Sequence, residues 1–468
     1  MKADERSHLQ RSPQRPVETS RPRIRAARVL LLLPLAACAH YAPSPLSPAP
    51  AVLAAPDAAA LSQAAATIDR PYLKPLAVDL AAPLDGNAVA VLAVVNNPDL
   101  KALRERAGIS DAQVFAARLL PDPTFSFGAS KVLSGPDPLP DLVGALGFDL
   151  NSLRTRGVKL AQARAAARQV RLDLAWNEWQ TAGQARIQAV RILALVRNLT
   201  LADATRANAR SLLDRTQRAA ARGDLAADQD QAARTAAADA EDKARTAERD
   251  LAAARFELNR LLGLPPQTSL LLASPAIPDV PLDPAKLFAI GQVNRTDIKA
   301  LEAGYASQEA ATRKAIMDQF PTLALTLTGN RDTAGNLIVG PAIDFTVPLW
   351  NRNRGGIAIE RATRAALKAE YEARLSQARA EIAAAVSGIL VARRQRDAVL
   401  RDLPSAERYA TATRRAAGRG DLALSTAETA EQALRDKQIL LAQSDQAIAE
   451  QMIALELLTG TLREAWTQ

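Results

Sequence analysis

Cysteine, histidine and aromatic residues are scarce in this chain of 468 residues. The single cysteine, Cys38, excludes an intramolecular disulfide and any metal site built from several cysteines. His8 and His40 are the only histidines, which leaves almost no material for imidazole catalysis or a histidine-based metal site. The chain also lacks a nucleophile elbow, a phosphate-binding loop and an HExxH pattern. We therefore expect no catalytic residue, no cofactor and no resident metal.

Alanine, leucine, arginine, glutamate and glutamine are prominent instead, and 48 % of the residues are hydrophobic. This mixture favours long helices that pack closely side by side. The net charge is +9, but residues 1–37 hold eight Lys or Arg against three acids, and the remainder carries only +4. Elsewhere basic residues alternate with acids, as on a solvated helix face, and no aromatics interleave with them to stack bases. The composition thus predicts a mainly helical protein and gives nucleic acid little support as a partner.

The N-terminus has the pattern of a secretory signal sequence. Four arginines precede the apolar run 29–37, which is too short to span a bilayer and ends in small residues. The run closes on Leu-Ala-Ala-Cys38, which resembles a bacterial lipobox, so we expect a signal peptide at 1–37 and acylation of Cys38. By the same resemblance, Ala39 in place of aspartate directs the lipoprotein to the outer membrane. The alternative is a buried thiol after an ordinary signal peptide. Residues 38–84 are expected to form the lipidated tether, extended where proline is dense at 42–56.

The rest of the sequence contains an internal duplication with an offset of 197 or 198 residues. Five stretches match in order: 98–103 with 296–301, 123–125 with 321–323, 154–157 with 352–355, 222–226 with 419–423, and Gly263 with Gly460. Five ordered matches at a nearly constant offset are strong evidence that one half was copied.

Each copy predicts a helix, a β-hairpin, a very long helix, a tight turn and a second long helix. No proline occurs between Pro140 and Pro265, and a helix over 157–221 would be roughly 95 Å long at ~1.5 Å per residue. Apolar residues recur there at three- and four-residue steps, as in a coiled coil. The expected boundaries are a first repeat at 85–283 with a β-hairpin at 122–150 and a coiled-coil hairpin at 157–262, and a second repeat at 284–468 with corresponding hairpins at 321–348 and 355–466.

The strand segments alternate in a way that suits a membrane-spanning barrel. Residues 321–329 and 337–347 place apolar and polar residues on opposite faces, and the first copy shows a weaker version of the pattern. Four strands cannot close a barrel in lipid, because an open edge would leave backbone groups unpaired. Three copies give twelve strands, which points to a trimer. Asp149 and Asp344 are candidates to face the lumen, and Asp344, which follows the inward phase, is the better candidate for pore lining.

These features resemble the TolC family of outer-membrane efflux proteins. The residues that carry the resemblance are Asn97-Pro98-Asp99-Leu100, Ala117 to Pro123, Val347-Pro-Leu-Trp-Asn-Arg-Asn-Arg-Gly355 and Leu457-Leu-Thr-Gly460. The Pro348 to Gly355 run and Leu403 to Glu407 are most similar to the cation-efflux branch. The resemblance implies an α+β, mostly α fold: a trimeric twelve-stranded β-barrel continuous with a long twelve-helix α-barrel. The subunit would be a passive duct that joins a periplasmic membrane-fusion adaptor and an inner-membrane efflux pump to the exterior.

Two Arg-Gly-Asp-Leu turns mark the ends of the long hairpins. Their residues are Arg222, Gly223, Asp224 and Leu225 in the first copy, and Arg419, Gly420, Asp421 and Leu422 in the second. Glycine at positive φ can end a helix and aspartate can cap the next one, so a plain turn is one interpretation. The family resemblance implies a second, compatible one, in which these tips contact the adaptor.

Family members also close the tip with inward carboxylates. The equivalent position here is Gln229 or Thr426, so the nearby acids Asp228, Asp230, Glu428 and Glu431 are gate candidates, although acids on a solvated face are the favoured interpretation for each.

Two other functions remain open on the sequence. A lipid-anchored periplasmic coiled-coil scaffold or adaptor would explain the long helices, but it gives no reason for alternating hairpins at matching places in both copies. A type I secretion duct would share the architecture and differ in its cargo. Heavy-metal cations or small toxic compounds are the expected substrates of the efflux duct.

Overall fold

The computed structural model describes residues 41–48, 50, 53–136, 139–275 and 280–466. The expected signal peptide and Cys38 lie outside the described residues. The chain divides into two units, Met1–Ala51 and Val52–Gln468, and the fold given below is that of the second unit.

The unit begins with the short helix α2 (Ala58–Ala66), which precedes the first repeat. The first repeat then contains, in chain order, α3 (Gly86–Asn96), α4 (Pro98–Arg118), β1 (Thr124–Ser130), β2 (Asp141–Asp149), α5 (Leu150–Ala221) and α6 (Ala227–Leu262). The second repeat follows the same order with α7 (Pro284–Asn294), α8 (Thr296–Met317), β3 (Leu323–Arg331), β4 (Leu337–Phe345), α9 (Arg354–Arg419), α10 (Leu424–Thr459) and the 3-10 turn η3 (Arg463–Ala465).

Two features differ from the sequence prediction. Each repeat opens with two helices, not one, because the chain turns at Asn97 and Arg295, which have extended backbones. The first very long helix begins at Leu150, well before Gly157, because the Asp149 carboxylate caps it by accepting from the Ser152 amide. Within residues 38–84, the helix α2 follows the proline-dense part 42–56 that was expected to be extended.

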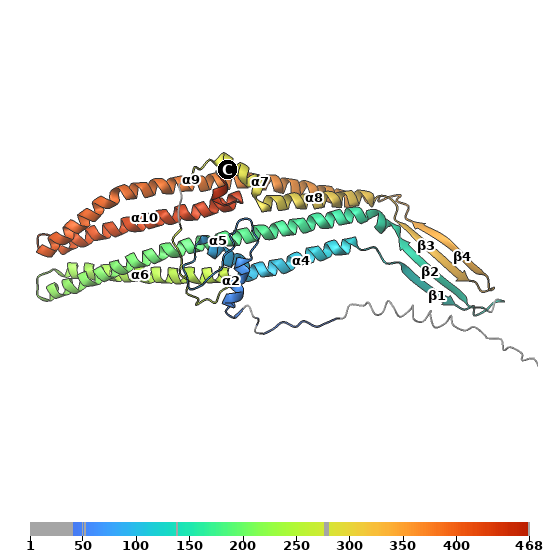
Figure 1. Cartoon of the computed structure of the whole chain (residues 1–468), viewed down its shortest axis with the longest axis horizontal. Helices are drawn as coiled ribbons and strands as arrows, with labels where there is room; N and C mark the ends of the chain where they lie inside the picture. The colour runs from blue at the N-terminus through green and yellow to red at the C-terminus, as the bar shows by residue number, and fades with distance from the viewer. Residues whose placement is uncertain (1–40, 49, 51–52, 137–138, 276–279, 467–468) are drawn as a thin grey trace, which may run out of the picture. The chain divides into compact units, whose positions relative to one another are not determined.

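The helices form a single layer in which the order is the same as in the sheet. α4 packs on α5, α5 on α8 and α8 on α9, while the four antiparallel strands run in the order β1-β2-β3-β4. Beyond the middle of the unit, α6 and α10 replace α4 and α8 as partners of the long helices: α6 packs on α5, and α10 packs on both α5 and α9. Figure 1 shows the sheet at one end of this unit and the α5–α6 and α9–α10 turns at the other. The layer therefore has one edge formed by β1, α4 and α6 and another formed by β4 and α9.

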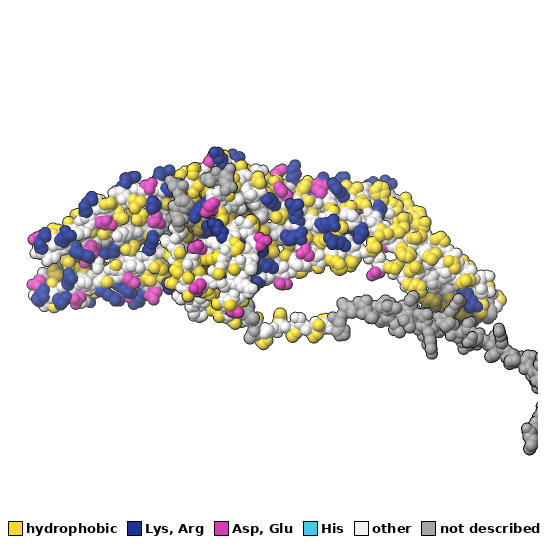
Figure 2. Space-filling model, in the orientation of Figure 1, with side chains coloured by type: hydrophobic (Ala, Val, Ile, Leu, Met, Phe, Trp, Pro, Cys, Tyr) yellow, Lys and Arg dark blue, Asp and Glu magenta, His cyan; other side chains and the backbone are white. Residues whose placement is uncertain are grey.

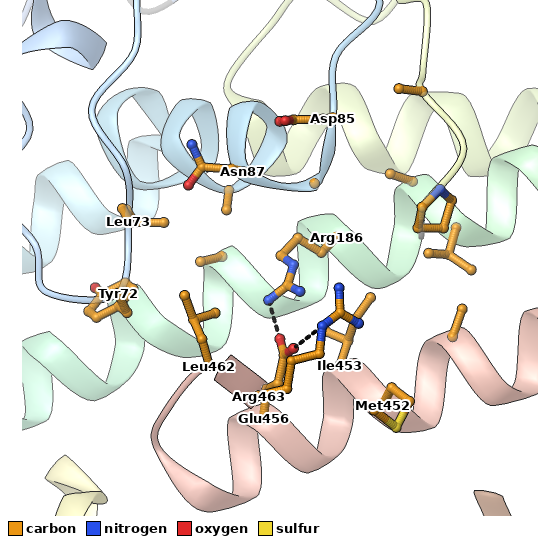
Figure 3. Close-up of a pocket in the computed structure, with 18 of the residues that line it drawn as sticks. Tyr72, Leu73, Asp85, Asn87, Arg186, Met452, Ile453, Glu456, Leu462 and Arg463 are labelled. Atoms are coloured by element: carbon orange, nitrogen blue, oxygen red, sulfur yellow. Dashed lines mark ion pairs between the residues drawn. The ribbon is translucent and has the colours of Figure 1, made fainter. Parts of the chain in front are cut away.

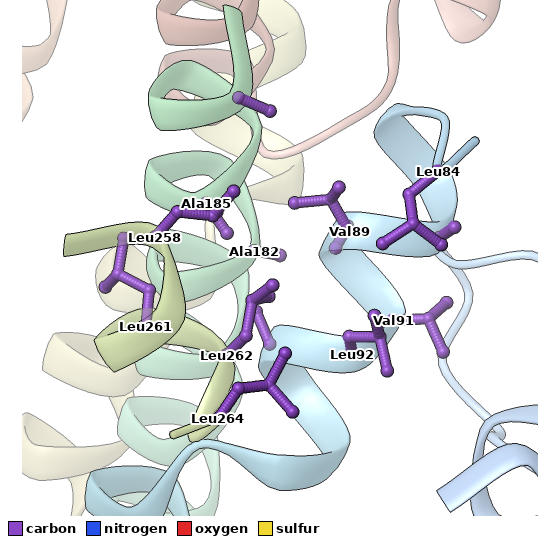
Figure 4. Packing of buried hydrophobic residues seen from close by; sticks show 14 of the residues in the cluster. Leu84, Val89, Val91, Leu92, Ala182, Ala185, Leu258, Leu261, Leu262 and Leu264 are labelled. Carbon is purple, nitrogen blue, oxygen red and sulfur yellow. The ribbon is translucent and has the colours of Figure 1, made fainter. Parts of the chain in front are cut away.

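The largest core lies where α3 packs between α5 and α6. Val89, Val91 and Leu92 of α3 are fully buried against Leu262 and its neighbours, as Figure 4 shows. Residues of the N-terminal segment join this core, among them Leu61 and Leu73. A backbone hydrogen bond from Leu84 to Leu271 and another from Ala273 to Leu84 attach the connector between the repeats. A second core under α7 holds α9 and α10 together in the other repeat.

Candidate functional site

The sheet has one apolar and one polar face. Residues that pair directly across an antiparallel sheet share a face, so the register assigns every side chain. The apolar face carries Phe125, Phe127, Leu142, Leu146, Phe148, Leu323, Leu325, Leu327, Val339, Ile343 and Phe345. Most of these side chains are exposed, Phe125 by 74 % and Val339 by 67 %. In Figure 2 hydrophobic side chains dominate the strand end, whereas charged side chains are distributed along the helices. An exposed apolar sheet of this extent suits a nonpolar solvent rather than water.

The polar face collects hydroxyls and carboxylates near the junction with the helices. Asp149 and Asp344 both pair with Ala324, one from each side, so they lie on the same face. The Thr326 hydroxyl lies 3.3 Å from the Asp344 carboxylate, and Asp122 lines the same hollow. The sequence favoured Asp344 over Asp149, whereas the register puts both on the polar face.

The two tip turns have the same geometry. Gly223 and Gly420 have φ values of 78° and 84°, a region that L side chains rarely adopt. The Arg222 guanidinium lies 2.9 Å from the Asp224 carboxylate, and Arg419 lies 2.8 Å from Asp421 in the second tip. The sequence suggested that these carboxylates cap the next helices, but they do not. Each aspartate is held by the arginine two residues before it, and the N-cap residue of the next helix is an alanine without a side-chain hydrogen bond.

Leu225 and Leu422 follow these ion pairs at the two tips. Leu422 is 43 % exposed and Leu225 is partly buried. Each tip therefore offers a neutralised charge pair and an accessible leucine.

The four gate candidates fall into different environments. Asp228 is exposed, and Asp230 accepts a hydrogen bond from Arg234 at 2.8 Å on the same helix. Glu431 is only 7 % exposed, so the expected solvated position is wrong for this residue. Its partners come from three helices: Arg435 of α10, Arg414 of α9 and, at 2.9 Å, the Asn208 amide of α5. The sequence missed this cluster because a Glu-Arg pair at i,i+4 looks like an ordinary surface pair.

Glu428 lies beside this cluster, and its effect on stability is expected to depend on pH. Burial, followed by repulsion from Glu431, raises its pKa, although Arg435, Arg414 and Arg215 oppose the rise. A raised carboxyl pKa means that the folded chain binds this proton more tightly than the unfolded chain, so this residue's contribution to stability falls as pH rises through that range. We expect Glu428→Gln to be more stable than the parent at pH 7, with the difference shrinking below about pH 4.5. Apparent melting temperatures at both pH values measure this, with Asp228→Asn as the exposed control. A difference that is independent of pH would contradict the expectation.

Further charged clusters, absent from the sequence prediction, join segments of the chain that are distant in sequence. Glu178 of α5 is 1 % exposed and lies 2.5 Å from Arg70 and 2.7 Å from Arg104. Burial alone would raise the pKa of Glu178, but the hydrogen bonds and charges of the two arginines bring it below its usual value. Glu456 of α10 is also buried and lies 2.6 Å from Arg186 of α5 and 3.5 Å from Arg463, an arrangement visible in Figure 3.

The described residues contain no group of three or more His, Cys, Asp or Glu side chains that could hold a metal ion. The charged clusters above are instead paired carboxylates and guanidiniums, which join helices. The described fold thus consists of a sheet with one apolar and one polar face and of a layer of long helices.

Comparison with known proteins agrees with this geometry. Residues 291–461 match the family model described as "Outer membrane efflux protein". No curated protein matches the sequence significantly. Among solved structures, the Campylobacter jejuni CmeC outer membrane channel has a TM-score of 0.69 at 15 % identity, with 80 % of this chain and 85 % of that chain covered.

Two further structures are similar over comparable lengths. The outer-membrane channel OprN matches with a TM-score of 0.67 at 19 % identity, covering 91 % of this chain and 99 % of that chain. CusC matches with a TM-score of 0.65 at 19 % identity, covering 80 % and 92 %. The matched family consists of channels and not of enzymes. The resemblance to the outer-membrane efflux family, expected from the sequence, is thereby confirmed by the family model over residues 291–461. The fold is shared with these solved channels over most of the chain.

Proposed function

We propose that the chain is one third of an outer-membrane channel that serves as the passive exit duct of a tripartite efflux system. The observation that carries this proposal is the four-stranded sheet, whose apolar face is exposed and whose opposite face bears hydroxyls and carboxylates. A sheet of this kind is suited to lipid on one side and water on the other. The long helices extend the same wall away from the membrane by about 1.5 Å per residue.

Association follows from the edges of the layer. β1 and β4 are the outer strands of the sheet, and their free backbone groups would be unpaired in lipid. Joining β4 of one copy to β1 of the next satisfies these edges, and three copies give twelve strands. A homotrimer is thus the assembly we propose, with the helices of three copies forming the tunnel.

The partners belong to the same proposal. A periplasmic membrane-fusion adaptor would contact the tips through Leu225 and Leu422, and an inner-membrane efflux pump would supply the energy. An acylated Cys38 would anchor the N-terminus in outer-membrane lipid. Heavy-metal cations or small toxic compounds are the proposed cargo, and selection among them would belong to the pump.

The experiment is purification of the full chain, followed by gel mobility with and without heating and by recording in planar bilayers. We expect a heat-sensitive trimer that forms ion-conducting channels. A monomer without channels, even when the tips are loosened by Glu431→Gln, would favour the lipid-anchored coiled-coil scaffold. A type I secretion duct would conduct as well and would be distinguished by export of a polypeptide instead of resistance to small toxic compounds.

The acids of the polar face supply a sharper test of the channel. Carboxylates on a pore wall raise the local concentration of cations. We expect Asp344→Asn to reduce the preference for cations over anions, and the double change with Asp149→Asn to reduce it further. Reversal potentials in a salt gradient measure the effect. Asp141→Asn, at the far end of the same face, is the control for position. Unchanged selectivity and conductance in the double variant would remove both residues from the pore.

A further inference from the structure

The two repeats meet inside the chain along α5 and α10, and we call this contact the inter-repeat seam. Its apolar centre is Ile453 of α10, which packs with Val190 and Ile187 of α5 and with Ala449. Ile453 is 5 % exposed and Val190 7 %. Ion pairs flank this centre: Arg186–Glu456 at 2.6 Å, Arg191–Glu450 at 3.6 Å and Arg197–Asp445 at 4.0 Å.

The duplication implies a second contact of the same kind, between copies of the chain. The equivalent of α5 is α9, and the equivalent of α10 is α6. Inside one chain these two helices lie at opposite edges of the layer, since α6 packs on α5 and α3 and α9 packs on α10, α8 and α7. A seam between α9 of one copy and α6 of the next would therefore repeat the internal one.

Core residues fix the alignment of the two long helices at this level. Ala185, Ala189 and Ile192 of α5 face the first core. Ile382, Val386 and Ile389 of α9, each 197 residues later, face the second. The helices α6 and α10 share the same offset, because Gly263 and Gly460 end them in the same left-handed conformation. An offset of 197 thus gives, for each residue of the inter-repeat seam, the equivalent residue of the contact between copies.

Transferred in this way, the apolar centre of the seam becomes Phe256 against Ala384 and Ser387. Phe256, the equivalent of Ile453, is 53 % exposed in the single chain. Ala384 and Ser387, the equivalents of Ile187 and Val190, are exposed as well. The side chains differ in size in a compensating way, since a larger residue on α6 faces smaller residues on α9. Volume-conserving exchanges of this kind preserve packing.

One ion pair of the inter-repeat seam also has an equivalent in the contact between copies. Arg197 and Asp445 correspond to Arg394 and Glu248, again a basic residue on the long helix and an acid on the return helix. Both are exposed, and neither has an ion-pair partner within the described part of the chain. Hydrophobic surface and opposite charge therefore recur at the places where the internal seam has them.

We infer that Phe256 of one copy packs on Ala384 and Ser387 of the next copy, with Glu248 and Arg394 paired beside them. This inference rests on the proposed trimer and names its helical contact. The contact joins two different surfaces of the same chain, so each copy presents one surface to one neighbour and the other surface to the next. Both surfaces of every copy are covered only when the copies form a closed ring.

Cysteine cross-linking tests the contact, and the duplication provides its control. In Phe256→Cys/Ser387→Cys, oxidation should give covalent trimers on a denaturing gel without reductant. In Val190→Cys/Ile453→Cys, the equivalent pair of the internal seam, oxidation should give cross-linked monomers only. The parent chain controls for Cys38. Phe256→Cys/Gln395→Cys moves the α9 cysteine by about 12 Å along the helix and should not cross-link.

A size exchange checks the packing independently of disulfide geometry. Phe256→Ser leaves a void and Ser387→Phe overpacks the site, so each alone should lower the temperature at which the trimer dissociates on a gel. The double variant should recover most of the loss. Additive losses in the double variant would contradict direct contact.

The outcomes separate the contact from the channel. A conducting trimer in which the 256–387 pair does not cross-link, although 190–453 does, overturns the contact and leaves the channel intact. Cross-linked ladders longer than a trimer overturn the closed ring. A chain that neither trimerises nor conducts overturns both proposals.

Discussion

Replacing Arg295 by alanine is expected to lower the free energy of unfolding by about 3 kcal/mol, since loss of one partner of a buried ion pair leaves the other charge uncompensated. The Arg295 side chain is fully buried and lies 2.8 Å from Asp297 and 3.8 Å from Glu381. Its guanidinium also lies 5.0 Å from the ring centroid of Trp176 on α5. One side chain therefore links α8, α9 and the first repeat, and its loss also leaves a cavity.

The pH dependence identifies the ion pair as the source of the effect. Burial alone would raise the pKa of Asp297, but Arg295 and then Arg374 outweigh it, so the pKa is lowered. A lowered carboxyl pKa gives stability that is present above the unfolded pKa of about 4 and is lost as pH falls through the folded value. The difference between parent and Arg295→Ala should thus shrink in acid.

Apparent melting temperatures from pH 3 to pH 8 measure this difference. Arg295→Lys is the matched control, because it keeps the charge but loses the paired hydrogen bonds to Asp297, and it should lie between the two. A constant difference across the pH range would assign the effect to packing alone.

Local patterns explain which parts of the fold the sequence could predict. The alternation in 321–329 and 337–347 is a property of consecutive residues, and it gave the phase of Asp344 correctly because a strand turns its side chains by half a rotation per residue. Glycine at the tips marked the turns for a similar reason. The break between α3 and α4 also had a local signal that was missed. Asn97 caps α4 through its side chain and Pro98 occupies the first turn, a common start of a helix.

The buried charges could not be predicted in this way, because their partners are distant in sequence. Arg104 and Glu178 lie 74 residues apart, and Trp179 donates to the Leu457 carbonyl from 278 residues away. A composition rich in Arg and Glu suggests solvated faces wherever the packing is unknown. Glu431 shows the limit most clearly, since one of its hydrogen-bond partners, Asn208, lies in the other repeat.

Replacing Gly263 by alanine is expected to destabilise the chain by about 3 kcal/mol, from strain and overpacking together. Gly263 ends α6 with a φ of 64°, a left-handed conformation that itself costs an L residue roughly 1 kcal/mol. A Cβ at this position would lie 2.5 Å from the Asn96 backbone oxygen. Relief requires α3 to move away from α6, which would break the hydrogen bonds from the Asn96 amide to the Leu262 and Gly263 carbonyls, each 2.9 Å long.

Two other glycines in the same conformation separate strain from packing. Gly223 at the first tip has a φ of 78°, and a Cβ there would meet nothing within 4 Å, so Gly223→Ala should cost only the strain. Gly460, the repeat equivalent of Gly263, would place a Cβ 3.0 Å from the Arg295 amide nitrogen and should fall between them. Apparent melting temperatures should therefore fall least for Gly223→Ala, more for Gly460→Ala and most for Gly263→Ala. Equal losses in all three would mean that left-handed strain alone sets the cost, and that the close approach of α3 to α6 does not constrain the end of α6.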